Sequence, residues 1–453
     1  MDNWTGRIDK VIWSSLKQMA EQPLPEISMG VGDQGLEWVG THGGASSRVS
    51  GRASSRVSGR ASSGLSGGAS GGAMEEISGT LGVEDLAEKV VETDGAIEGL
   101  VSAQLPVHGT TGQGDISDRQ APYLNMVQEK LGQTLRYSGP LEPILAHLMS
   151  TTGKLLRPRL VISSASAFAD LDTANESRYS LYVSPSHDRL ISMITDIAAA
   201  FEMVHIASLV HDDIIDGSSE RRGLPVIHDI WGIHSAILTG DYLFSRANNT
   251  ALLYAHIGIA GLLNDAVELM CRGEVAQDNR LYDSTVTPSD YFYQIGRKTA
   301  ALIAAACKAG AMAAGAPPDT QSQLWQFGIR LGTAFQIVDD ILDLVSDEEA
   351  LGKPVFNDLK RGTMTLPLIY AMETEIRSDI IDCFGNRTVP TSNIPTIREK
   401  LVSAGCIEEA AGAATTLLES ARQNLLALPP SLGRDQLWQM SVQLGEKAVS
   451  ATT

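Results

Sequence analysis

Apolar residues recur at helical spacing along most of the chain, from about residue 118 onward. Alternating apolar and polar runs rich in β-branched residues, the pattern typical of strands, are rare there. We therefore predict an all-α domain over 118–453, and a chain segment of that length can bury a large core. The predicted helices cover residues 120–150, 155–170, 190–216, 233–257, 260–278, 288–313, 320–346, 363–385, 395–404, 408–427 and 434–450.

The first 117 residues have a different pattern and divide into three segments. Residues 1–44 form an extension whose first 22 residues carry Ile8, Val11, Ile12, Leu16 and Met19 at the spacing of a short amphipathic helix. Residues 45–73 repeat an eight-residue unit of Ser, Gly, Ala and Arg, which cannot bury a core and predicts a flexible linker. Residues 74–117 are acidic and mostly irregular, with at most one short helix near 83–91.

Charge and cysteine content narrow the class of function. The 453-residue chain has a formal net charge of −19, which argues against nucleic acid and anionic membrane surfaces as partners. Its four cysteines are scattered without a CxxC pair, so neither a zinc site nor a disulfide framework is indicated. We expect no signal peptide and no transmembrane segment, the longest apolar run being the Ala-rich stretch near 299–315. These features predict a cytoplasmic protein.

One acidic motif occurs twice in the helical region. The pentapeptide Asp212-Asp213-Ile214-Ile215-Asp216 recurs as Asp339-Asp340-Ile341-Leu342-Asp343, and we call these the first and second aspartate boxes. Residues i and i+4 share one helix face, so each box directs two carboxylates the same way. Apolar residues precede both boxes, so the carboxylates face an interior where unpaired negative charge is costly. Mg²⁺, which takes one or two carboxylates together with substrate phosphates, would relieve that cost. Two such faces across a cavity would hold a diphosphate between them.

Basic residues surround the two boxes in five segments. Lys154 and Arg157 lie three apart at the start of a predicted helix, beside the positive end of its dipole. The other segments contain His205, two turns before the first box; Arg221 and Arg222 in the loop after it; Lys298 and Thr299 inside an apolar helix; and Lys353 after the second box. Each segment alone is compatible with a surface role, but their joint placement around two acidic faces favours an anion site.

These segments resemble those of the trans-isoprenyl diphosphate synthases. The similarity rests on GKLLRP, HDDIID, RRG, GDYL, GRKTA, FQIVDDILD and GKPVFNDLKRGTMTLP, which occur in this order over residues 118–450. Among these enzymes the chain is most similar to the bacterial long-chain polyprenyl diphosphate synthases, which include the large subunit of heptaprenyl diphosphate synthase. The resemblance implies the isoprenoid synthase fold, an α-helical bundle whose two box helices face each other across a deep cavity.

The resemblance also implies a reaction and roles for these residues. Isopentenyl diphosphate would be added head-to-tail to an allylic diphosphate such as farnesyl or geranylgeranyl diphosphate. The product would be a long all-trans chain for quinones such as menaquinone. Roughly three Mg²⁺ ions would be held by Asp212, Asp216 and Asp339, supported by Asp213, Asp340 and Asp343. Lys154, Arg157, His205 and Arg222 match positions that bind isopentenyl diphosphate, and Arg221, Lys298, Thr299, Gln336 and Lys353 match the allylic site. A homodimer, or a heteromer with a small accessory subunit, is implied.

Four positions depart from the family pattern. Thr152 and Leu155 stand where the usual GGKRxRP pattern has Gly and Arg, although Lys154 and Arg157 remain. Thr363 stands where shorter-chain members often have Lys, so Lys360 or Arg361 could substitute in part. Phe356 replaces a usual Gly.

The residues before the first box bear on product length. Ala207 and Ser208, about one turn before Asp212, are small, whereas short-chain members have bulky aromatic residues there. A deeper tunnel is implied, with Val204 and Phe201 as candidates for its floor. We therefore predict a product of roughly six to ten isoprene units, with seven favoured by the resemblance.

Three alternatives remain open at this point. A class I terpene cyclase would share the fold but would normally carry a different second metal motif, and it would not need an isopentenyl site. A non-catalytic partner subunit would normally lose aspartates, and all six are present. An active subunit that requires a small accessory subunit is fully compatible with the sequence.

Overall fold

The computed structural model describes residues 28–32, 35–39, 118–136, 139–150, 153–169, 171, 187–346, 356–387 and 389–452. The chain divides into two compact units, one of which spans residues 23–106. The described part of that unit is an antiparallel hairpin of β1 (Ser28–Gly32) and β2 (Gly35–Val39), which pair with Gly32 opposite Gly35. The amphipathic helix predicted in residues 1–22, the repeat at 45–73, and the 74–117 segment with its short helix near 83–91 lie outside the described residues.

The other unit is built from helices, as predicted. They are α3 (Ala121–Thr134), α4 (Glu142–Ser150), α5 (Leu156–Ser166), α6 (His187–Ile215), α7 (Ile227–Trp231), α8 (Ile233–Leu252), α9 (Ile259–Asp278), α10 (Pro288–Ile295), α11 (Ala301–Ala313), α12 (Pro318–Val345), α14 (Asn357–Arg361), α15 (Leu366–Ala371), α16 (Arg377–Asn386), α17 (Ile394–Ser403), α18 (Cys406–Leu426) and α19 (Leu432–Ser450). Short elements join them: 3₁₀ turns η2 (Asp118–Gln120), η3 (Ala255–Ile257) and η5 (Thr391–Asn393), the π-helical segment η4 (Gly296–Ala300), and the strand pair β3 (Glu220–Arg221) and β4 (Leu224–Pro225).

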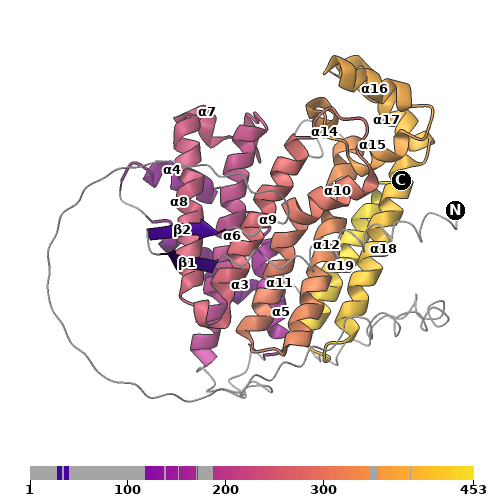
Figure 1. The fold of residues 1–453 in the computed structure, drawn as a ribbon. Coiled ribbons are helices and arrows are strands. Elements are labelled where there is room, and N and C mark those ends of the chain that lie inside the picture. The colour runs from indigo at the N-terminus through magenta and orange to yellow at the C-terminus, as the bar shows by residue number, and fades with distance from the viewer. Residues whose placement is uncertain are drawn as a thin grey trace, which may run out of the picture. The chain divides into compact units, whose positions relative to one another are not determined.

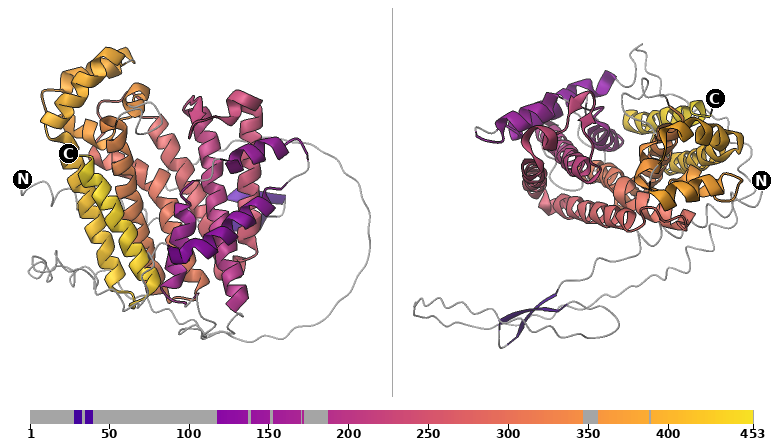
Figure 2. Two further views of the ribbon diagram at one scale, coloured as in Figure 1. Left: turned by 180° about the vertical axis from the view of Figure 1, so that it is seen from behind. Right: turned by 90° about the horizontal axis from the view of Figure 1, so that it is seen from above.

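The long helices run side by side and form a bundle (Figure 1). Seen from above, α18 and α19 stand on one side of this bundle and α6 and α8 on the other (Figure 2). Helix α11 packs against α5, α9 and α12 between them. It is almost wholly buried because most of its residues are alanine or other apolar types on every face, the pattern of a helix enclosed by others.

Three predicted helices are divided in the structure. The 120–150 segment is two helices, since residues 139 and 140 are Gly and Pro, which favour a turn. The 288–313 segment is interrupted by η4, and the 363–385 segment is the two short helices α15 and α16. Apolar spacing alone did not predict these breaks, because the segments on both sides of each break have apolar residues in the core.

Helix α6, which carries the first box, is long and apolar enough to cross a membrane by length and composition. The consecutive helices α17 and α18, bent by 61°, also pass that test when taken together. This differs from the prediction that no segment is long enough. However, 61% of the apolar window of α6 is buried inside the protein, as in a core helix.

Glycines bring η4 close to the helices beside it. An added Cβ on Gly273 of α9 would lie 2.4 Å from the backbone nitrogen of Lys298, and one on Gly332 of α12 would lie 2.6 Å from the Cα of Ala300. Both distances are shorter than real Cβ contacts, so only glycine allows these approaches. The π-helical segment is therefore held between α9 and α12 at backbone distance.

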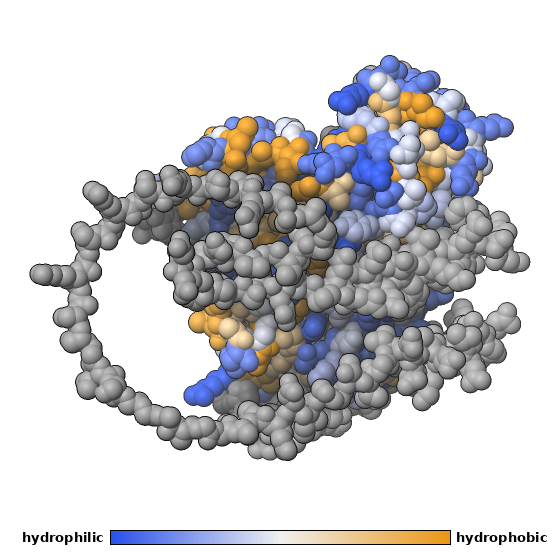
Figure 3. Space-filling view, in the orientation of Figure 1, coloured by the Kyte–Doolittle hydropathy of each residue, from blue (hydrophilic) through white to orange (hydrophobic). Residues whose placement is uncertain are grey.

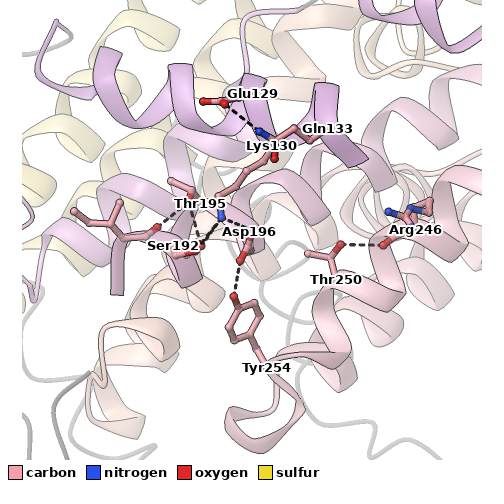
Figure 4. A network of polar contacts seen from close by, with 10 residues as sticks. Glu129, Lys130, Gln133, Ser192, Thr195, Asp196, Arg246, Thr250 and Tyr254 are labelled. Atoms are coloured by element: carbon pink, nitrogen blue, oxygen red, sulfur yellow. Dashed lines mark hydrogen bonds and ion pairs between the residues drawn. The ribbon is translucent and has the colours of Figure 1, made fainter. Parts of the chain in front are cut away.

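A polar network joins α3, α6 and the turn after α8 (Figure 4). Lys130 forms an ion pair with Asp196 and donates to the backbone carbonyl and hydroxyl of Ser192, both at 3.1 Å. The Tyr254 hydroxyl donates to the other oxygen of Asp196 at 2.6 Å, and its pKa is raised by burial and by that carboxylate. The bonds of Lys130 thus connect α3 to α6, which pack against each other.

We predict that Gly273→Ala lowers the free energy of unfolding by about 1–3 kcal/mol, because its methyl group would overlap the backbone of η4. Urea unfolding measures this change. The matched control is Gly261→Ala on the same helix, where nothing lies within 4 Å of the added atom. That control should be neutral or stabilising by about 0.5–1 kcal/mol. Equal stability of the two variants would contradict the close approach.

Candidate active site

A cavity of about 2200 Å³ opens among α5, α6, α9, α12 and α19. Five of the six box aspartates line it: Asp212, Asp216, Asp339, Asp340 and Asp343. The predicted arrangement of the two boxes on facing helices around one cavity is therefore present. The remaining aspartate, Asp213, is buried outside the lining.

In the first box the protein itself neutralises Asp213. Arg221 donates to its Oδ1 from Nε at 2.8 Å and from Nη2 at 2.7 Å. Asp212 has no hydrogen bond or ion pair to another described side chain. Burial, together with the nearby charges of Glu274 and Asp216, raises its pKa to about 7 against the opposing effect of Lys298. Asp212 is thus a half-buried carboxylate that lacks a direct cationic partner among the described residues.

The second box shows a similar division of roles. Asp340 accepts hydrogen bonds from the Tyr291 hydroxyl at 2.6 Å and from Gln336 Nε2 at 2.8 Å. Its pKa is well above the usual range because of burial and the neighbouring Asp358. Asp343 accepts backbone N–H bonds at the start of α14, at 3.3 and 3.2 Å. Asp339 is exposed to the cavity and makes no hydrogen bond or ion pair with the described residues.

The π-helical segment directs Lys298 and Thr299 into the cavity between the boxes. Lys298 Nζ lies 2.7 Å from Glu274 Oε2 and donates to Gln277 at 3.4 Å. Burial alone would lower the pKa of Lys298, but Glu274 and Asp212 together raise it, so the amine stays charged. Thr299 Oγ1 donates to Gln336 Oε1 at 2.6 Å. An irregular turn inside an apolar helix thus places a cation beside the first box.

The four residues predicted to bind isopentenyl diphosphate, Lys154, Arg157, His205 and Arg222, line one part of the same cavity. Arg222 lies against Gly153, where an added Cβ would be 2.7 Å from its Nη2. Burial lowers the pKa of Arg157 to about 10, which leaves the guanidinium charged at neutral pH. The pKa of His205 is well below its usual range, through burial and then through the charges of Arg157 and Arg222. His205 is therefore neutral at physiological pH.

Only some of the remaining predicted residues line the cavity. Lys353 and Thr152 lie outside the described residues. Of the four chain-length residues, Ser208 lines the cavity, whereas Ala207, Val204 and Phe201 are buried in the core and are not part of its wall. The face of α6 that meets the cavity runs through His205, Ser208 and Asp212, so it is rotated slightly from the face that we predicted.

Several cavity residues were missed in the sequence. They are Glu202, Glu274, Gln277, Tyr291 and Asp358. Glu202 is buried near Arg157 and Arg222; its pKa is raised by burial and lowered in part by those two charges. Each of the five lies on a helix, but only the packed structure shows that all of them line the same cavity as the boxes.

The donor set fits Mg²⁺ bound together with a phosphate ligand. Within the described ranges, no group of three or more acidic, histidine or cysteine side chains is arranged to hold a metal alone. Mg²⁺ typically takes only one or two carboxylates and completes its shell with water and substrate phosphates. Asp212 and Asp339, which lack direct partners among the described side chains, provide such carboxylates on facing helices.

Comparisons with known proteins agree with this geometry. Residues 139–401 match the family model described as polyprenyl synthetase. The chain is 34% identical over 325 residues to heptaprenyl diphosphate synthase component 2 of Geobacillus stearothermophilus, covering 72% of this chain and 95% of that protein. It is also 34% identical to solanesyl diphosphate synthase 1 of Arabidopsis thaliana, covering 64% and 67%.

Solved structures show the same fold. The crystal structure of heptaprenyl diphosphate synthase from Staphylococcus aureus aligns with a TM-score of 0.63 at 28% identity, covering 74% of this chain and 99% of that one. A polyprenyl synthase from Caulobacter crescentus, complexed with calcium and isoprenyl diphosphate, aligns with a TM-score of 0.65 at 28% identity, covering 75% and 99%. With two aspartate boxes and a cationic group around one cavity in an all-α bundle, this chain belongs to the polyprenyl synthetase family and is a trans-prenyltransferase.

Proposed function

We propose that this enzyme is a Mg²⁺-dependent long-chain polyprenyl diphosphate synthase. It adds isopentenyl diphosphate head-to-tail to an allylic diphosphate such as farnesyl or geranylgeranyl diphosphate. One observation carries the proposal: a single cavity contains both carboxylate boxes and a separate group of cations. A terpene cyclase, which uses one diphosphate, has no need of the second group.

The cationic group binds isopentenyl diphosphate without metal. Lys154 lies two residues before α5, and Arg157 lies in its first turn, so the helix dipole adds to their charge. Arg222 approaches the same loop at Gly153. His205 is neutral and contributes a hydrogen bond to this subsite. The buried Glu202 offsets part of the positive charge before the substrate binds.

The allylic diphosphate binds between the boxes. Asp212, Asp216 and Asp339 would hold roughly three Mg²⁺ ions, and Asp213, Asp340 and Asp343 would support them. The bound Mg²⁺ would neutralise the leaving diphosphate and promote ionisation of its C–O bond. Lys298, Arg221 and Lys353 bind the diphosphate oxygens. The oxygens of Thr299 and Gln336 face the positive charge that develops on the allylic carbon. No side chain is assigned as a base, since the departing diphosphate accepts the proton.

The product chain extends past Ser208 into the apolar part of the cavity. That part is lined by residues of the three helices α8, α9 and α11: Phe244, Val267, Met270, Leu302 and Ile303. Ser208 is small, so it leaves the entrance open one turn below Asp212. We propose a product of roughly six to ten isoprene units, with seven favoured by the heptaprenyl relatives. These five apolar residues of the cavity wall replace Val204 and Phe201 as candidates for the tunnel floor.

Helix α8 offers a face for another subunit. Ile233, Ile237 and Leu238 are about half exposed on it, and hydrophobic residues gather over α7 and α8 at the upper left of Figure 3. We propose that a second copy of the chain covers this face. Two relatives are named component 2 of their enzymes, so a small accessory subunit is the alternative occupant. The mass of the purified protein in solution distinguishes the two.

Incubating the purified chain with isopentenyl and farnesyl diphosphates tests the function. We expect products of roughly six to ten isoprene units that form with Mg²⁺ and are absent when EDTA is added. The products are dephosphorylated, separated by chromatography and identified by mass spectrometry. A product that stops at three units would contradict the long-chain proposal. Hydrocarbon released from farnesyl diphosphate alone would identify a cyclase, and activity only after adding a small subunit would identify a heteromer.

Substitutions at His205 test whether it acts as a neutral hydrogen-bonding group. We predict that His205→Gln keeps the KM for isopentenyl diphosphate within about threefold, whereas His205→Leu raises it about tenfold. The KM for farnesyl diphosphate is the internal control and should change little in either variant. An equally large loss in both variants would show that the positive charge of an imidazolium is required.

Ser208→Phe should shorten the product by one or more isoprene units, because the ring would enter the cavity one turn below Asp212. Phe201→Leu is the matched control: Phe201 is fully buried but outside the cavity wall, so product length should stay unchanged. Mass spectrometry of the dephosphorylated products gives both answers. Longer products from Phe201→Leu would restore that residue as the floor.

A further inference from the structure

The short helix α14 connects the two aspartate boxes. At its start, Asn357 and Asp358 donate backbone N–H bonds to the carboxylate of Asp343, and the N–H of Phe356 donates to the Asp343 carbonyl at 2.9 Å. After it, the Gly362 carbonyl accepts a hydrogen bond from the Tyr282 N–H at 2.8 Å. Both ends of the helix are therefore attached, one of them directly to the second box.

The last residue of α14 extends to the first box. Arg361 forms an ion pair with Asp216, and both side chains are about one quarter exposed. Arg361 lines the cavity, as does Asp216. A guanidinium attached through α14 to the second box thus neutralises the last carboxylate of the first box.

A metal ion and Arg361 would compete for the same carboxylate. When Asp216 binds Mg²⁺, its charge is satisfied by the ion, and the guanidinium loses its partner. Arginine presents several N–H donors in a planar fork that matches diphosphate oxygens, so the released side chain suits the ligand that arrives with the metal.

Two hydroxyl groups near α14 also indicate a ligand there. Thr363 and Thr365 follow α14, and both line the cavity. Their Oγ1 atoms are buried and have no hydrogen-bond partner among the described residues. Buried hydroxyls normally find a partner, and an oxygen-rich ligand would supply acceptors for them.

We propose that Arg361 is an exchangeable counter-ion of the first box. It neutralises Asp216 in the metal-free enzyme and turns to the allylic diphosphate when the metal takes Asp216. The identity of that diphosphate rests on the proposed function, but the exchange itself requires only a metal ion and a diphosphate group. Arg361 is thereby an additional positively charged side chain for the diphosphate, alongside Arg221, Lys298 and Lys353.

The first test uses Mn²⁺ as a probe, with no substrate present. Electron paramagnetic resonance of free Mn²⁺ should show that Arg361→Gln binds the metal roughly threefold to tenfold more tightly than the wild type, since Asp216 no longer has a competing partner. Arg280→Gln is the matched control, because Arg280 forms ion pairs with Asp283 and Asp290 outside the cavity wall. Unchanged metal affinity in Arg361→Gln would overturn the exchange.

The second test measures binding of inorganic pyrophosphate by calorimetry with saturating Mg²⁺. Arg361→Gln should weaken the Mg²⁺-dependent binding about tenfold, and Arg361→Lys should weaken it less because the charge remains. Thermal melting of each variant shows that it is folded. Pyrophosphate binding equal to that of the wild type would overturn the diphosphate contact. Neither test requires turnover, so failure of the long-chain product assay would leave both results interpretable.

Discussion

The concentration of negative charge around one cavity is the constraint on which most of this site depends. Six box aspartates, with Glu202, Glu274 and Asp358, lie in or beside one space enclosed by helices. Unpaired buried carboxylates are costly, so each must be paired, hydrogen-bonded or protonated. The protein meets this need in part: Arg221 pairs with Asp213, Arg361 with Asp216 and Lys298 with Glu274, while Tyr291 and Gln336 donate to Asp340.

The carboxylates that the protein leaves without a partner are the ones suited to bind metal. Asp212 and Asp339 lack a direct partner among the described residues, and burial raises the pKa of Asp212 to about 7. A divalent cation would remove that cost, so part of the energy of metal binding comes from charge already buried in the folded protein. The same logic explains why cations of the protein stand close by. They neutralise carboxylates of the site, and their charge also suits a diphosphate.

Backbone conformation around the cavity is unusual for the residues that occupy it. Leu155, Arg222, Tyr282 and Phe356 all have φ between 52° and 61°, the left-handed region that favours glycine. Phe356 stands where the resemblance leads us to expect Gly, and its positive φ explains that preference. Its side chain is fully buried, and Arg398, which bonds the carbonyls of Leu344 and Ser346 at the end of α12, lies over its ring. Burial and these contacts offset the backbone strain.

The sequence by itself determined the helices, the two boxes and the segments that carry the cations. The spacing of apolar residues and the i, i+4 spacing of the aspartates depend only on neighbouring positions in the chain. Asp212 and Asp216 could therefore be assigned to one helix face before any packing was known. The tertiary structure decided what those faces meet. The rotation of α6 excludes Phe201, Val204 and Ala207 from the cavity wall, and the π-helical segment, held by Gly273 and Gly332, directs Lys298 toward Glu274. Arg361 reaches Asp216 because α14 is attached at Asp343. These relations join residues far apart in the chain through helix rotation and backbone approach, which no local pattern encodes.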